Sequence, residues 1–124
     1  SGSAGSTTFN TATNQVDINI GASSMFTTTQ IVSHELLHGY QSLFWNLDFG
    51  PSGTTGGLLY DKTDEMATFT RQNLFAPSQQ NQVDVPSTVN TYYPNLPSGP
   101  KSFHLLSPTE QTQYYNLRSL GRYH

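Results

Sequence analysis

Residues 31–40 constrain this chain more than any other segment, because His34 and His38 stand four residues apart and Glu35 follows the first of them. In an α-helix, residues four apart lie one above the other, so both imidazoles can reach one ion. Glu35 projects about 100° around the helix from His34, which suits contact with a water on the open side of that ion. The rest of the segment is uncharged, as a helix in a domain core requires. The pattern predicts a metal site on a central helix.

A simpler interpretation is that the two histidines only satisfy hydrogen bonds inside a core. Two histidines and a glutamate on an otherwise uncharged helix are costly to bury without a ligand. The metal site is therefore the preferred interpretation.

The third ligand must be histidine or carboxylate, because the chain has no cysteine. A catalytic zinc has three protein ligands and one open position. The candidates are Asp48, Asp61, Asp64, Glu65, Asp84, His104 and His124. Glu65 is preferred because it follows His38 by 27 residues, in the first turn of the next expected helix. Asp64 stays open as the alternative ligand, or as the hydrogen-bond acceptor of a ligand imidazole.

Residues 7–20 predict a β-hairpin ahead of the metal segment. Its second strand has one apolar face, formed by Val16, Ile18 and Ile20. Residues 1–8 are small and polar and predict a flexible lead-in, so a single domain is expected over residues 9–124.

A long helix is expected from Thr27 to about Leu47, because Thr27 and Gln30 have the spacing of a capping box. Its apolar side chains are Ile31, Leu36, Leu37, Tyr40, Leu43 and Phe44. A surface of this breadth is expected to face the core and to make the helix central to the fold.

The remaining elements follow from local signals. A second helix is expected over residues 63–75, opened by Asp61 or Thr63. Residues 77–100 show no hydrophobic period and predict an extended connection over the surface. A last helix is expected over residues 107–121, where a Ser-Pro-Thr-Glu start is followed by a glycine stop.

The His34-Glu35-Leu36-Leu37-His38 segment, with the segment that begins at Glu65-Met66-Ala67-Thr68-Phe69, resembles the gluzincins, a group of zinc metallopeptidases. The resemblance covers about residues 15–75. In the second helix of gluzincins a small residue often stands three positions after the glutamate ligand. Thr68 holds that position if Glu65 is the ligand, and Ala67 holds it if Asp64 is the ligand. The sequence lacks the extended motif of the metzincins and the pattern of the aspzincins.

The resemblance implies a small zincin-like α+β domain. A short antiparallel or mixed sheet would pack on the zinc-binding helix, with a second ligand-bearing helix and a C-terminal helix. It implies Zn²⁺ held by His34, His38 and Glu65, and Glu35 as general base for a metal-activated water.

It further implies an oxyanion donor, for which Tyr60 and His104 are the first candidates, ahead of Tyr92, Tyr93 and His124. A strand before the zinc helix, residues 16–20 or its neighbour, is expected to pair with extended substrate.

Three functions are compatible with these residues. The first is a zinc peptidase, expected to be an endopeptidase, that acts on proteins or peptides. The second is a secreted toxin-type zinc hydrolase directed at one target protein or at a peptidoglycan peptide. The third is a zinc-binding interaction module without turnover.

Composition narrows the partners. A net charge of −3 and five scattered lysine and arginine residues argue against nucleic acid. No apolar run approaches the roughly 18 residues that span a bilayer. A polar composition with only 10% charged residues is typical of secreted or cell-surface bacterial proteins. The small, polar residues 1–8 suggest that the domain is part of a longer chain.

Overall fold

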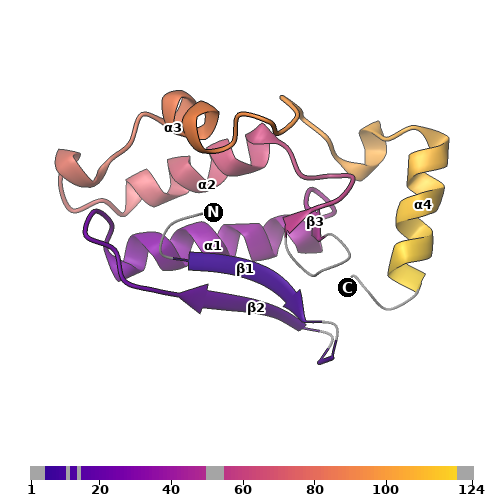
Figure 1. The fold of residues 1–124 in the computed structure, drawn as a ribbon, viewed down its shortest axis with the longest axis horizontal. Helices are drawn as coiled ribbons and strands as arrows, with labels where there is room; N and C mark the ends of the chain where they lie inside the picture. Colours follow the sequence, from indigo (N-terminus) through magenta and orange to yellow (C-terminus); the bar gives the residue numbers. More distant parts are fainter. Residues whose placement is uncertain (1–4, 11, 14, 50–54, 120–124) are drawn as a thin grey trace.

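The structure of the protein, a computed structural model, describes residues 5–10, 12, 13, 15–49 and 55–119. Its elements in chain order are β1 (Gly5–Asn10), β2 (Gln15–Ile20), α1 (Thr28–Leu43), β3 (Asp48–Phe49), β4 (Thr55–Gly56), α2 (Lys62–Leu74), a 3-10 turn (Gln79–Asn81), α3 (Val85–Tyr92), a second 3-10 turn (Phe103–Leu105) and α4 (Pro108–Ser119). The described chain is thus α+β, as expected. Helix α1 contacts the hairpin β1–β2 and α2, and α3 packs on α2 (Figure 1).

The hairpin is antiparallel and reaches α1 closely through β1. Gly5 pairs with Ile20 at one end of the ladder. A Cβ at Gly5 would lie only 2.8 Å from Cγ2 of Ile31 and 3.0 Å from Cγ of Glu35, so this contact requires glycine. The flexible lead-in expected over residues 1–8 is wrong for residues 5–8, which pair with β2; residues 1–4 lie outside the described part.

The fully buried face of the hairpin belongs to β1 and not to β2. Thr7 and Phe9 are buried, whereas Val16 and Ile18 are half-buried and Ile20 is 38% exposed. The expected apolar face of the second strand is therefore only partly covered. The reason is that β1 carries the closest contact with α1 and the aromatic contact of Phe9 with the core.

Helix α1 begins as expected and ends earlier. Thr27 and Gln30 form the capping box, since the backbone N–H of Gln30 donates to Oγ1 of Thr27 and Oε1 of Gln30 accepts from the N–H of Thr27. The expected end near Leu47 is wrong because Trp45 has a φ of 61°, which no helix residue can adopt. The Trp45 ring packs edge-on against Phe103 and thereby anchors this turn to the core.

Of the apolar side chains expected to face the core, Ile31 is buried and Leu37 is half-buried, but the other four are exposed. Leu36, Tyr40, Leu43 and Phe44 are 49% to 68% exposed. The buried residues are Gln30, Ile31, His34, Glu35, His38, Gln41 and Ser42. Polar side chains can be buried here because β1 and α2 supply their hydrogen-bond partners. The apolar face instead lines one side of a groove of about 230 Å³ between α1 and α2.

The apolar core lies past the C-terminal end of α1. Its members are Phe9, Leu47, Phe49, Leu59, Tyr60, Phe103, Leu106 and Tyr114. They join the end of β1, the chain that follows α1, and α4. The core therefore holds the second half of the chain onto the hairpin and leaves the α1–α2 interface to polar residues.

The later helices combine confirmed and corrected expectations. Asp61 caps α2 by accepting from the N–H of Thr63, and Ser107 accepts from the N–H of Glu110 at the start of α4. The expected extended connection over residues 77–100 is wrong, because it contains α3 and a 3-10 turn. Asp84 caps α3, a local signal that was overlooked.

Within the described residues, none of the helices combines the length and apolar character needed to cross a bilayer.

Candidate metal centre

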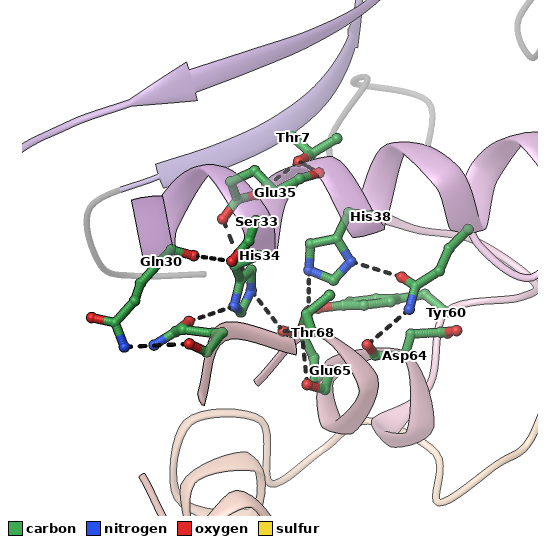
Figure 2. Close-up of polar contacts among 12 residues, drawn as sticks. Thr7, Gln30, Ser33, His34, Glu35, His38, Tyr60, Asp64, Glu65 and Thr68 are labelled. Atoms are coloured by element: carbon green, nitrogen blue, oxygen red, sulfur yellow. Dashed lines mark hydrogen bonds and ion pairs between the residues drawn. The ribbon is translucent and has the colours of Figure 1, made fainter. Parts of the chain in front are cut away.

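His34, His38 and Glu65 meet where α1 and α2 face each other (Figure 2). Nε2 of His34 lies 3.4 Å from Oε1 of Glu65, and Nε2 of His38 lies 3.0 Å from Oε2. One potential ligand atom of each residue lies within 4.8 Å of the other two. Two ligands of a tetrahedral zinc lie roughly 3.4 Å apart, given bonds of about 2.1 Å. The three residues could therefore hold a metal ion.

The chemistry of the cluster also fits a cation. The three side chains are at most 5% exposed. Nε2 of His34 is buried and has no hydrogen-bond partner among the described residues. An orphaned ring nitrogen of this kind is costly, and a cation beside it removes the cost.

The electrostatics of the cluster are those of a buried ion pair. Burial by itself raises the pKa of Glu65, but the two imidazoles beside the carboxylate, those of His34 and His38, outweigh it and hold that pKa well below the ordinary value. Burial likewise lowers the pKa of His38, but the hydrogen bond and charge of Glu65 raise it overall. The anionic carboxylate is thus available to a metal, which would compete with a proton for His38.

The outer nitrogens of both imidazoles contact glutamine side chains. Nδ1 of His34 lies 2.9 Å from Oε1 of Gln72, and Nδ1 of His38 lies 2.9 Å from Oε1 of Gln41. Sequence reasoning missed both glutamines. A weak signal existed, because Gln41 follows His38 by three residues and so lies on the same face of the helix.

Glu35 lies at the edge of the cluster and is held by the hairpin. Its Oε2 is 3.9 Å from Nε2 of His34. The hydroxyl of Thr7 lies 2.7 Å from Oε1 of Glu35 and 3.0 Å from its backbone carbonyl oxygen (Figure 2). Thr7 was not anticipated, because nothing in the sequence marks one strand threonine as the partner of a residue 28 positions away.

Of the two first candidates for the oxyanion donor, Tyr60 lies at the metal cluster and His104 does not. The Tyr60 hydroxyl donates to Oε2 of Glu65, and the ring lies edge-on to His38. His104 is exposed on the second 3-10 turn, with its ring against Phe103.

The Asp64 carboxylate is outside the metal cluster. Its Oδ2 accepts from the N–H of Asp61 within the capping box of α2, while its backbone carbonyl accepts from Nε2 of Gln41. Burial raises the pKa of Asp64 to about 8. The structure therefore makes Asp64 a partner of Gln41 through its backbone.

The other sequence candidates have structural contacts elsewhere or lie outside the described residues. Asp48 accepts from the N–H groups of Leu58 and Leu59. Asp61 and Asp84 cap helices. Tyr92 is 72% exposed and Tyr93 is the C-cap residue of α3, whereas His124 lies outside the described residues.

No protein-family model, curated protein or solved structure matches this chain. The gluzincin resemblance therefore remains a prediction that depends on the residues of the cluster.

Proposed function

We propose that the protein is a zinc-dependent peptidase that hydrolyses peptide bonds in protein or peptide substrates. The observation that supports it best is the grouping of His34, His38 and Glu65 within 4.8 Å. The Glu35 carboxylate lies beside that group, 3.9 Å from the orphaned nitrogen of His34. Three ligands and an adjacent acid are what metal-assisted hydrolysis requires.

Zinc is the preferred metal because the donors are two imidazoles and one carboxylate, a set found in catalytic zinc sites. With neutral imidazoles and an ionised Glu65, the site keeps about one unit of positive charge. A zinc ion bound there would acidify a water molecule and polarise a peptide carbonyl.

The residues of the chain move the protons. Glu35 takes a proton from the attacking water and passes it to the leaving amine. Thr7 keeps the Glu35 carboxylate in place during both steps. Tyr60 is assigned to the oxyanion in preference to His104, because its hydroxyl already lies on the Glu65 carboxylate.

We assign substrate binding to the edge of β1, which is the neighbour of the strand at residues 16–20. Among the described elements, β1 pairs with β2 along one side only. An extended peptide can add to the other edge through main-chain hydrogen bonds. Because Thr7 on β1 contacts Glu35, a peptide on that edge would run beside the catalytic base.

The test combines metal content with a matched pair of variants. Purified protein is expected to carry one zinc per chain and to cleave a mixed peptide library. Glu35→Gln is expected to keep the zinc and to lose activity by about 100-fold or more. Glu110→Gln on α4 makes the same chemical change outside the cluster and is expected to keep both. Failure to take up zinc from an excess, or equal cleavage by Glu35→Gln, would refute the proposal.

The deep burial of the cluster favours a second candidate, a zinc-binding module without turnover. The ligand side chains are only 1% to 5% exposed, and structural zinc sites are closed by a fourth protein ligand. Cobalt substitution separates the two functions. An open position gives a visible spectrum that changes when azide is added, whereas a closed site gives a spectrum that azide leaves unchanged.

A further inference from the structure

Gln41 is held at both ends of its side-chain amide. Its Nε2 donates to the backbone carbonyl of Asp64 over 3.0 Å, and its Oε1 lies 2.9 Å from Nδ1 of His38. The Gln41 side chain is buried, so no solvent competes for either contact. The amide therefore bridges α1, which carries both histidines, and the first turn of α2, which carries Glu65.

The orientation of this amide determines the tautomer of His38. A backbone carbonyl only accepts hydrogen bonds, so the amide must turn its NH₂ group toward Asp64. The carbonyl of Gln41 then faces Nδ1 of His38, and that nitrogen must carry hydrogen. In neutral His38 the lone pair is consequently on Nε2, the atom that lies 3.0 Å from Glu65.

Gln72 supports His34 in a different way. Its Oε1 lies 2.9 Å from Nδ1 of His34. Its Nε2 is buried and finds no hydrogen-bond partner among the described residues. No acceptor therefore requires an NH₂ group at this position, and the amide of Gln72 is not held in one orientation.

We propose that Gln41 is a positioning residue that fixes His38 as the Nδ1–H tautomer, directs its Nε2 at the metal position and couples this ligand to α2, whereas Gln72 is not locked. The inference rests on the proposed metal site but does not require peptidase activity. It predicts that substitution by glutamate weakens zinc binding at Gln41 but not at Gln72.

The expected difference follows from the second atom of each amide. In Gln41→Glu, one carboxylate oxygen can still accept from His38, but the other faces the carbonyl of Asp64 and repels it. In Gln72→Glu, the carboxylate accepts from His34 without losing any donor contact. A carboxylate partner also makes a ligand imidazole more basic.

The experiment measures zinc affinity by competition with a chromophoric chelator. Gln41→Glu is expected to weaken zinc binding by about 10- to 100-fold, the usual cost of losing an outer hydrogen-bond partner. Gln72→Glu is expected to bind zinc as tightly as wild type or more tightly. Gln113→Glu on α4 adds the same charge at an exposed position and serves as the control. Equal losses at both glutamines, or tighter binding by Gln41→Glu, would overturn the proposal.

Nitrogen-15 NMR of the histidine rings reads the tautomer directly. In zinc-free Glu65→Ala, which removes the carboxylate that lies 3.0 Å from Nε2, neutral His38 is expected to carry hydrogen on Nδ1. Gln41→Met, which removes both contacts without adding charge, is expected to lose this preference and carries the test if Gln41→Glu does not fold. Hydrogen on Nε2 of His38 in zinc-free Glu65→Ala would refute the proposal. This NMR measurement needs neither zinc nor turnover. Its result therefore does not depend on whether the protein is a peptidase.

Discussion

The hydroxyl of Thr7 on β1 lies 2.7 Å from the carboxylate of Glu35 on α1, and both side chains are buried. This contact connects the edge strand to the acid beside the metal cluster. A hydrogen bond to a charged group contributes about 1.5 to 3 kcal/mol. The position of Glu35 therefore depends on the position of the hairpin.

Thr7→Val tests this connection, because it keeps the shape of the side chain and removes the donor. We expect kcat to fall by about 10-fold or more while zinc affinity stays unchanged, since Thr7 contacts no ligand. Thr7→Ser should restore kcat. Thr8→Val, at the next position of the strand, is the control. A loss of zinc affinity in Thr7→Val would show a general structural effect instead.

Gly5→Ala tests the close approach of β1 to α1. The new Cβ would lie 2.8 Å from Ile31 and 3.0 Å from Glu35, so we expect a loss of about 1 to 3 kcal/mol in the free energy of unfolding. Gly39→Ala on α1 is the matched control, because nothing lies within 4 Å of its Cβ position. That variant should be neutral or stabilised by up to roughly 1 kcal/mol. Urea unfolding measures both, and equal effects would contradict the packing of β1.

The zinc-free protein should lose stability as pH rises from about 4 to about 8. Burial raises the pKa of Asp64 from 3.8 to about 8, so the folded chain holds a proton that the unfolded chain has lost. The raised pKa of His38 acts with the same sign: its contribution is complete below pH 6.5 and is lost as pH rises through the folded value. Below pH 4.5 the lowered pKa of Glu65 acts with the opposite sign, because its contribution is lost as pH falls.

Urea unfolding across this pH range measures the slope. Asp64→Asn removes one titrating group and keeps an acceptor for the Asp61 N–H, so the decline between about pH 4 and 8 should become shallower. A decline of unchanged slope in Asp64→Asn would show that its pKa is not raised by burial.

The third ligand is tested by comparing the two neighbouring acids of α2. Glu65→Ala removes a carboxylate that lies 3.0 Å from His38, and we expect zinc affinity to fall by more than about 100-fold. Asp64→Ala removes a capping group and should cost far less affinity. Chelator competition measures both, and the reverse order would assign the ligand to Asp64.

The exposed outer side of α1 and the buried chain that follows it predict unequal costs for two leucines. Leu43 is 60% exposed and Leu47 is fully buried. Leu43→Ala should change the free energy of unfolding by no more than about 0.5 kcal/mol, whereas Leu47→Ala should cost about 2 to 5 kcal/mol. Similar losses at both positions in thermal or urea unfolding would show that the outer face of α1 is covered.

Local contacts are the part of this fold that could be predicted from the sequence. The capping boxes of Thr27 with Gln30 and of Ser107 with Glu110 are satisfied within one helical turn. The same holds for the i, i+4 spacing that places His34 and His38 on one face. The overlooked α3 belongs to this class, because its cap Asp84 acts only three residues ahead.

The sequence by itself therefore determined where helices begin and that two histidines share a face, because these depend on backbone geometry over a few residues. Only the tertiary structure decided that the polar face of α1 is buried and that Leu36 and Leu43 are exposed. The reason is that Thr7, Asp64 and Gln72 provide hydrogen-bond partners for this face from positions 23 to 38 residues away along the chain. A hydrophobic pattern gives no information on such partners, since their hydrogen bonds exist only once the elements have packed.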